Sequence, residues 1–281
     1  MASALFSKIK RRLYDDATFL GYWYGYLSLP LIPLFYATYH FSLHWSIVPA
    51  ATVAALLAVD IGRRLSQTRL LGPIIRRVDT EEKLIALTFD DGPNPPFTED
   101  ILATLSRHEA KATFFMIGEQ AAKHPDTVKA VLKQGSQVGN HGWTHRPLLG
   151  RTPLGVSREI RRTDHLLQTL GSSKLIPFRA PYAAQFISVP LVLALMQKPN
   201  VMFDVTPDDW RGEKAKVIAD RVIKQIQPGS IVLLHDGGGD RKQTVLAVKT
   251  ILRELSKQGY RFVTTETLMA VGPTQGDSRK D

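Results

Sequence analysis

The chain has 281 residues, no cysteine and a formal net charge of +10. The absence of cysteine excludes disulfide bonds, thiolate metal sites and a cysteine nucleophile, and the length allows one large domain or two small ones. Residues 1–80 carry nine Lys and Arg against four Asp and Glu, so half of the positive excess lies there. This distribution indicates a basic region next to a membrane. Nucleic-acid binding is not indicated, because the later sequence lacks a dense basic stripe with interleaved aromatic residues.

Residues 17–59 contain no Asp, Glu, Lys or Arg, a run of 43 residues. The run is longer than one bilayer crossing needs, and aromatic segments within it, such as "YHFSLHW", favour a membrane interface. We therefore predict two membrane helices, near residues 17–38 and 44–62, in a membrane-associated segment over residues 1–80. A bacterial inner membrane is the expected location, and the basic flanks favour a cytoplasmic position for both ends. A hairpin buried in a soluble core is the alternative.

After residue 80 the pattern changes to short apolar runs separated by amphipathic stretches. The alternation predicts a parallel sheet, open or closed, in a domain over residues 81–270, followed by a disordered tail over residues 271–281. The runs predict seven strands, at residues 84–89, 112–118, 136–140, 175–179, 201–206, 230–235 and 260–264. The stretches predict helices at residues 98–108, 119–135, 155–171, 214–229 and 242–259, with Thr98 as an N-cap and Gly135 and Gly171 as stops.

Chemically reactive side chains follow the predicted strands repeatedly. Because the carboxyl ends of parallel strands meet at one edge of the sheet or barrel, these side chains are expected to converge. Two histidines four residues apart can aim at one point, and two imidazoles with one carboxylate leave open positions on a divalent ion. One of two adjacent aspartates can then bind the ion while the other accepts a proton. The residues concerned are Asp90 and Asp91, His141 and His145, Arg179, Asp208 and Asp209, and His235.

Taken singly, each of these features has a simpler explanation. "DDGP" can be a turn with an aspartate cap, the two histidines can lie in a loop, and His235 can be a core histidine. Arg179 can form a plain salt bridge, and Asp209 can be a loop carboxylate. The placement of all of them at strand ends favours a shared site.

Five motifs occur in one order: "TFDDGP", "HGWTH", "RAPY", "TPDDW" and "LLHD". With them the sequence resembles the polysaccharide deacetylases of carbohydrate esterase family 4, which include the nodulation-type chitooligosaccharide deacetylases, over about residues 83–268. The resemblance implies a distorted (β/α)7 barrel and one divalent metal ion, with zinc expected and cobalt or nickel as alternatives. It also implies roles: Asp90 as catalytic base; Asp91, His141 and His145 as metal ligands; His235 as general acid; Arg179 as the group that orients the base; Asp209 as the carboxylate that tunes the acid; the Tyr182 N–H in the oxyanion site; and Trp210 and Leu233 as walls of the acetyl pocket.

Three positions depart from the family pattern. Gly142 stands where Ser or Thr commonly follows the first histidine, Thr206 replaces the first Asp of the Asp-x-x-Asp-Trp pattern, and Ala183 replaces the glycine of Pro-Tyr-Gly. No expected ligand or proton carrier is missing.

The resemblance implies a metal-dependent hydrolase that removes N-acetyl groups from an acetylamino-sugar in a polysaccharide, an oligosaccharide or a lipid-linked glycan. The expected partners are the acetylated glycan and the membrane, without nucleic acid. One alternative is an O-acetyl esterase or a deformylase acting on a lipid-linked sugar. Another is a non-catalytic, membrane-anchored glycan-binding protein. The ligand types alone are also compatible with an iron oxygenase.

Overall fold

The computed structural model describes residues 51–54, 56–57, 73–173 and 175–275. The chain divides into two compact units, residues 1–61 and 62–281. The membrane helix predicted over residues 17–38 lies outside the described residues. Of the one predicted over residues 44–62, the described positions 51–54 and 56–57 are helical. Within the described part of the chain, no helix combines the length and the apolar character that a bilayer crossing requires.

Four strands form the centre of the second unit: β3 (Leu84–Asp90), β4 (Ala112–Met116), β5 (Gln137–Asn140) and β7 (Ile231–His235). They pair in the order β5-β4-β3-β7, and every pairing is parallel. A short strand, β8 (Arg261–Phe262), pairs in parallel with the first residues of β3. Parallel strands are usually covered on both faces, and every residue of β3 and β4 is buried. The predicted α/β architecture with parallel strands is confirmed.

Two predicted strands are reduced to short pairings. In the segment predicted over residues 175–179, Phe178 bridges β5 and β6 (Asn200–Val201) in parallel. In the segment predicted over residues 201–206, Val205 bridges β7 in parallel. The parallel pairings therefore lead from β7 through β3, β4 and β5 and return to β7 by way of Phe178, β6 and Val205.

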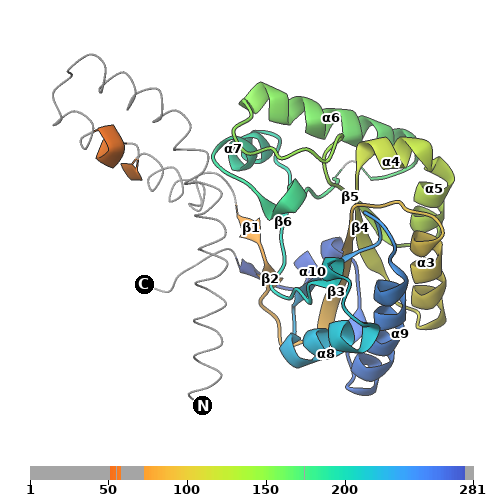
Figure 1. The fold of residues 1–281 in the computed structure, drawn as a ribbon. Helices are drawn as coiled ribbons and strands as arrows, with labels where there is room; N and C mark the ends of the chain where they lie inside the picture. Colours follow the sequence, from red (N-terminus) through yellow and green to blue (C-terminus); the bar gives the residue numbers. More distant parts are fainter. Residues whose placement is uncertain (1–50, 55, 58–72, 174, 276–281) are drawn as a thin grey trace. The chain divides into compact units, whose positions relative to one another are not determined.

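The helices surround the strands (Figure 1). The stretch predicted as one helix over residues 119–135 forms two, which meet at His124. Pro125 explains the break, because proline has no N–H to continue a helix and disfavours helical backbone in the preceding residue. The helices with described bounds are α3 (Phe97–Arg107), α4 (Gly118–Lys123), α5 (Pro125–Lys133), α6 (Pro153–Thr169), α7 (Ser188–Leu195), α8 (Ala215–Gln225), α9 (Lys242–Lys257) and α10 (Thr265–Met269).

Gly135 and Gly171 follow the ends of α5 and α6 with φ angles of 80° and 107°, as the sequence predicted. The predicted N-cap is wrong: α3 begins at Phe97, so Thr98 lies inside its first turn. The Thr98 hydroxyl instead accepts a hydrogen bond from the Asn94 N–H (2.8 Å) and donates one to Asp236 Oδ2 (2.6 Å). Thr98 thus joins the segment after β3 to the segment after β7.

The folded body extends beyond the predicted range of 81–270 at both ends. On the N-terminal side, β1 (Ile74–Ile75) pairs in parallel with β6. Next to it, β2 (Arg77–Val78) pairs antiparallel with β9 (Thr274–Gln275), so residues 274 and 275 of the predicted disordered tail are part of a sheet. Residues 276–281 of that tail lie outside the described residues.

Alternation along β3 separates two faces. Ile85, Leu87 and Phe89 belong to the large cluster that packs against helices such as α3 and α9, whereas Leu84 and Ala86 belong to a second cluster that includes residues of β4, β6 and β7. Because side chains of a strand point alternately to opposite faces, Thr88 and Asp90 share the face of Leu84 and Ala86. The last carboxylate of β3 therefore points away from the outer helices.

Candidate active site

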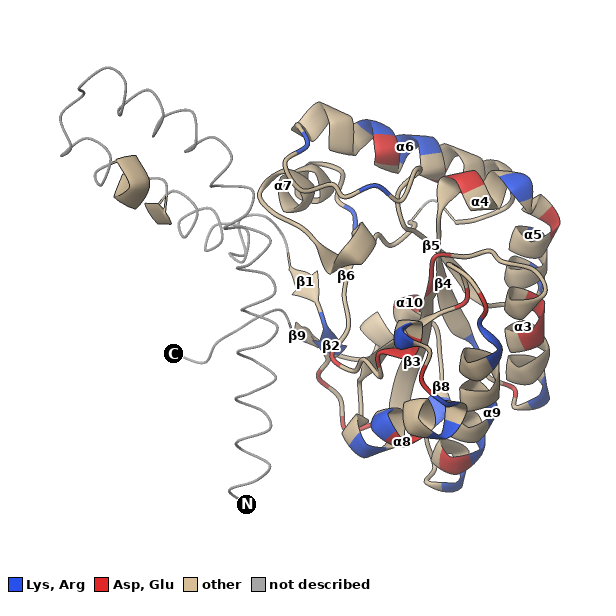
Figure 2. Cartoon of the chain, in the orientation of Figure 1, with Lys and Arg blue, Asp and Glu red and all other residues tan. Residues whose placement is uncertain are grey.

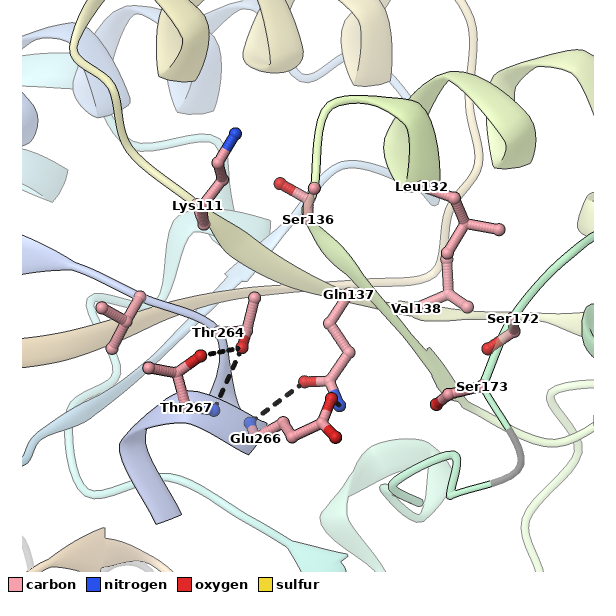
Figure 3. Close-up of a pocket in the computed structure, with 12 residues that line it drawn as sticks. Lys111, Leu132, Ser136, Gln137, Val138, Ser172, Ser173, Thr264, Glu266 and Thr267 are labelled. Carbon is pink, nitrogen blue, oxygen red and sulfur yellow. Dashed lines mark hydrogen bonds between the residues drawn. The ribbon is translucent and has the colours of Figure 1, made fainter. Parts of the chain in front are cut away.

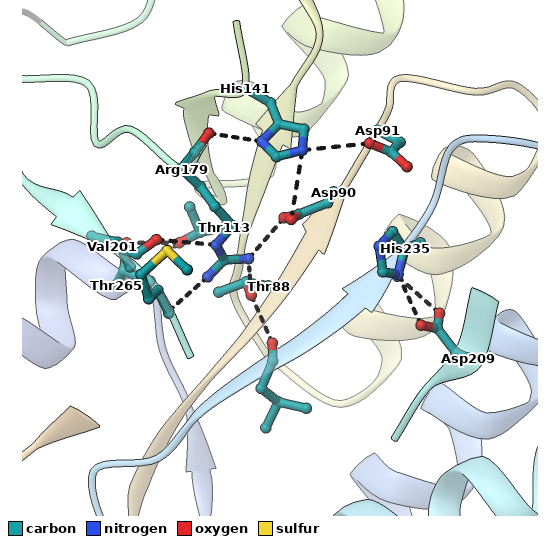
Figure 4. A network of polar contacts seen from close by, with 12 residues as sticks. Thr88, Asp90, Asp91, Thr113, His141, Arg179, Val201, Asp209, His235 and Thr265 are labelled. Atoms are coloured by element: carbon teal, nitrogen blue, oxygen red, sulfur yellow. Dashed lines mark hydrogen bonds and ion pairs between the residues drawn. The ribbon is translucent and has the colours of Figure 1, made fainter. Parts of the chain in front are cut away.

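The reactive side chains gather at the carboxyl ends of the central strands, as predicted. Asp90 and His235 are the last residues of β3 and β7, and they pair in register. His141 directly follows β5. Asp91, the first residue after β3, adopts a left-handed backbone conformation (φ 74°). Figure 4 shows the aspartates, His141, Arg179 and His235 grouped around these strand ends.

Asp91, His141 and His145 come together as a set of potential metal ligands. Among the described residues they are the one group of three His, Cys, Asp or Glu side chains whose ligand atoms all lie within 4.8 Å of one another. The Nε2 atoms of His145 and His141 lie 2.9 Å and 3.4 Å from Asp91 Oδ1. His141 Nδ1 donates to the Arg179 carbonyl oxygen (2.8 Å), which leaves Nε2 as the nitrogen that faces the carboxylates.

The arrangement of these three groups fits a divalent cation. Asp91 Oδ1 is buried. Imidazole nitrogens lie close to it, but no described group donates a well-aligned hydrogen bond to it. Burial opposes the charge of Asp91, but the contacts with the two histidines outweigh it and lower the pKa of the carboxyl. Burial likewise opposes a charge on His141, yet Asp90 and Asp91 raise its pKa. The site therefore attracts positive charge, which a proton or a metal ion can supply.

Asp90 is held by a buried arginine. Arg179 Nη1 donates to Asp90 Oδ1 and to Thr88 Oγ1, both at 2.7 Å, while its other nitrogens donate to the carbonyl oxygens of Val201 and Met202 at 3.1 Å and 2.9 Å. Thr88 in turn donates to the Val232 carbonyl oxygen at 2.6 Å. Arg179 thus fixes one oxygen of Asp90. The other oxygen, Oδ2, lies 3.8 Å from His141 Nε2 and faces the ligand group.

His235 forms a pair with Asp209 on the other side of the group. Its Nδ1 lies 2.8 Å from Asp209 Oδ1, and its backbone N–H donates to Asp209 Oδ2 at 2.9 Å. Thr244 also donates to Oδ2 at 2.9 Å. Burial disfavours the charged imidazole, but the hydrogen bond and charge of Asp209, together with the charges of Asp90 and Asp91, raise the pKa of His235. The raised pKa favours the protonated form of His235, which a proton donor requires.

The remaining predicted residues lie around these groups. Tyr182 sits in a short 3-10 turn with φ 59°, and the residue is 64% exposed. Its ring packs on the His145 ring at 4.6 Å between centroids. Trp210 follows Asp209 in a second such turn and meets the His235 ring edge-on at 5.3 Å. Leu233 lies two residues before His235 on the same face of β7. Apart from Leu233, which lies in the middle of β7, the predicted site residues lie at one end of the sheet.

The sequence analysis did not predict the side chains that form hydrogen bonds with the predicted site residues and with the loop between His141 and His145. Thr88 supports Arg179, and its position two residues before Asp90 on one strand was a usable signal. Thr244 at the start of α9 and Glu159 on α6 carried no such signal, because their partners lie far away in the sequence.

A cavity of about 490 Å³ lies elsewhere, at the amino ends of β4 and β5 (Figure 3). Its lining includes Lys111, Gln137 and Glu266. The carboxylates and imidazoles described above lie at the opposite ends of these strands, so we assign the chemistry to the strand ends and not to this cavity.

The similarities to known proteins agree with this geometry. The polysaccharide deacetylase family pattern matches residues 77–197. A peptidoglycan-N-acetylglucosamine deacetylase of Bacillus cereus is 38% identical over 200 residues, which cover 70% of this chain and 93% of that protein. A chitooligosaccharide deacetylase of Sinorhizobium fredii is 32% identical over 197 residues, covering 66% of this chain and 92% of that protein.

A crystal structure of a peptidoglycan N-acetylglucosamine deacetylase, bound to 4-naphthalen-1-yl-N-oxidanyl-benzamide, superposes with a TM-score of 0.66 at 32% identity, covering 72% of this chain and 94% of that one. The chain therefore belongs to the polysaccharide deacetylase family and is a hydrolase of carbon–nitrogen bonds other than peptide bonds.

Proposed function

We propose that this protein removes the acetyl group from N-acetylglucosamine residues of a glycan such as peptidoglycan or a chitooligosaccharide, with a divalent metal ion held by Asp91, His141 and His145. The observation that carries the proposal is the convergence of a ligand group, an arginine-held carboxylate and a carboxylate-held imidazole at one end of the sheet. The return of the parallel pairings to β7 supports the distorted (β/α)7 barrel that the family resemblance implies.

Each residue has a role in splitting the amide into acetate and an amine. When bound, the metal ion polarises the acyl oxygen and makes water more acidic. Asp90 Oδ2 accepts a proton from the attacking water, since Oδ1 is already held by Arg179. The Tyr182 N–H donates to the developing oxyanion. His235, held through Nδ1, presents Nε2 and donates its proton to the departing sugar nitrogen.

Purified protein should release acetate from N-acetylglucosamine oligomers or from peptidoglycan glycan strands. A panel that includes an O-acetylated glycan and an N-formyl amino-sugar separates this activity from an esterase or a deformylase, because acetate and formate are measured on each substrate. Glycan binding without any product after long incubation would favour the non-catalytic alternative and contradict the proposal.

Removal of the metal is expected to stop acetate release. Protein dialysed against a chelator should be inactive, and addition of Zn²⁺ should restore the rate, with Co²⁺ and Ni²⁺ tested in parallel. The reason is that Asp91, His141 and His145 would hold the ion, and such an ion lowers the pKa of bound water toward neutrality. Parental turnover by protein shown by elemental analysis to hold no metal would contradict the proposed chemistry.

Replacing Asp209 with asparagine is expected to shift the pH profile. His235 must be protonated to act as an acid, so kcat/KM falls as the pH rises through its pKa. Asp209 helps to raise that pKa. Two donors, the His235 N–H and the Thr244 hydroxyl, fix the amide oxygen of the variant at the Oδ2 position, which turns its NH₂ group toward Nδ1. The high-pH limb should therefore move to lower pH.

The matched control for this variant is Asp208→Asn. Asp208 is the neighbouring carboxylate, and its Oδ2 atom lies 4.0 Å from Arg211 Nε. The pH profile of the Asp208→Asn variant should match that of the parent. An unchanged high-pH limb in Asp209→Asn would show that Asp209 does not tune the acid.

We further propose that the protein is attached to a membrane, on the strength of the uncharged run at residues 17–59 and its basic flanks. Reporter fusions at residues 41–43 and at the carboxyl end should report opposite compartments if two helices cross the bilayer. The same compartment for both fusions would contradict the hairpin.

A further inference from the structure

The loop between the two metal-binding histidines adopts a backbone that needs support. Gly142 has a φ of 80° and His145 a φ of 56°, both in the left-handed region. For a residue with a side chain, such as His145, this region is unfavourable unless the surroundings hold it. The aim of the His145 ring at Asp91 therefore depends on whatever fixes residues 142–144.

Two side-chain acceptors bind the three successive N–H groups of this loop. Asn140 Oδ1 accepts from the Gly142 N–H at 2.8 Å. Glu159 Oε2 accepts from the N–H groups of Trp143 and Thr144, both at 2.9 Å. The Thr144 hydroxyl lies 3.2 Å from each oxygen of Glu159. A side-chain oxygen that accepts hydrogen bonds from two successive N–H groups fixes the direction of both.

Glu159 reaches the loop from a rigid element. Figure 2 shows basic and acidic positions side by side on α6, whose sequence "PLGVSREIRRTDHLLQT" contains Glu159 among several arginines. Glu159 is buried, with Arg151 3.6 Å away. One turn further on, the Arg162 guanidinium stacks over the Trp143 ring at 3.8 Å. Trp143 and Thr144 of the loop are thus held by Glu159 and Arg162 of α6.

We infer that Glu159 is a positioning residue of the metal site, which holds the loop so that the imidazoles of His141 and His145 face Asp91. Gly142 has no side chain with which to hold the loop, and Glu159 supplies the anchoring acceptor from α6. The inference rests on the proposed function only in taking Asp91, His141 and His145 as metal ligands.

Three substitutions separate geometry from charge. Glu159→Gln keeps an oxygen that can accept both N–H bonds and loses the charge. Glu159→Asp keeps the charge but withdraws the oxygen by one methylene. Glu159→Leu removes both. The affinity of metal-free protein for Zn²⁺ is measured by competition with a chromophoric chelator, and the Co²⁺ absorption spectrum reports the coordination geometry.

Glu159→Leu and Glu159→Asp are expected to bind Zn²⁺ about 10–100-fold more weakly, the usual loss when a group that orients a ligand is removed. Both should also show an altered Co²⁺ spectrum, whereas Glu159→Gln should match the parent in both measurements. The control Glu99→Leu removes a partly buried carboxylate of α3 whose hydrogen-bond partner is Thr127, and it should leave metal affinity unchanged. This variant accounts for any general loss of stability.

Parental affinity in folded Glu159→Asp or Glu159→Leu would overturn the inference. A loss in Glu159→Gln as large as in Glu159→Leu would also overturn it, since charge rather than the accepted hydrogen bonds would then matter. If Glu159→Leu fails to fold, the Asp and Gln variants still decide the question. Failure of the parent itself to bind a divalent ion would instead contradict the proposed function.

Discussion

Replacing Asp90 with asparagine is expected to lower the rate constant for acetate release by about 10²–10⁴-fold, the range for loss of a general base. Asparagine keeps the shape of the side chain and can still accept from Arg179 Nη1, which donates to Asp90 Oδ1 at 2.7 Å in the parent. It has no basic oxygen to take a proton from water. Initial rates of acetate release with saturating Zn²⁺ measure the effect.

The same variant should also be less stable. Arg179 is fully buried, and its partner carboxylate is lost. Removal of one member of a buried ion pair typically lowers the free energy of unfolding by about 3–5 kcal/mol, which denaturant titration can detect. The control Asp100→Asn changes an exposed carboxylate on α3 and should alter neither quantity. A folded, metal-loaded Asp90→Asn that turns over at the parental rate would show that another group is the base.

Replacing His235 with alanine is expected to lower acetate release from N-acetyl sugars by about 10²–10⁴-fold, as for loss of a general acid. An amine leaves an acyl carbon poorly unless it is protonated, and His235 is the imidazole whose pKa is raised beside Asp209. Aryl acetate esters test the assignment, since their phenolate leaving group departs without a proton. The loss on an aryl ester should be much smaller than the loss on the amide.

The control for this pair of substrates is His165→Ala, which changes an exposed histidine on α6 and should leave both rates unchanged. Equal losses on amide and ester in folded His235→Ala would mean that His235 supports the site in another way than by donating a proton. Parental turnover of the amide would remove His235 from the mechanism.

The strand ends explain why so much of the site was predictable. Asp90, Asp91, His141 and His235 each stand at the end of a predicted strand or directly after one, and parallel strands bring their carboxyl ends together whatever the exact curvature of the sheet. The family motifs added roles that spacing alone leaves open, such as which aspartate faces the metal. The structure is compatible with that division, because Arg179 holds Asp90 while both imidazoles face Asp91.

Two segments were predicted wrongly because the periodicity of their apolar residues describes them poorly. The sequence analysis did not predict a helix at the position of α7. The helix α7 is apolar almost throughout, so it lacks the polar face that marks an amphipathic helix. Residues 175–179 read as a strand, yet only Phe178 is paired there. In both places tertiary contacts, not local preference, decide the conformation.

The amino-acid sequence was enough to predict the parallel α/β class, the segments that form the central strands β3, β4, β5 and β7, and the gathering of reactive groups at their carboxyl ends. These properties are local, because each depends on an apolar run and on the few residues that follow it. Contacts between distant segments, visible only in the folded chain, show which side chains hold these groups, such as Thr244 on Asp209 and Glu159 on residues 143 and 144. They also place β9 beside β2. Such contacts depend on how distant segments pack, and no local pattern of residues encodes that packing.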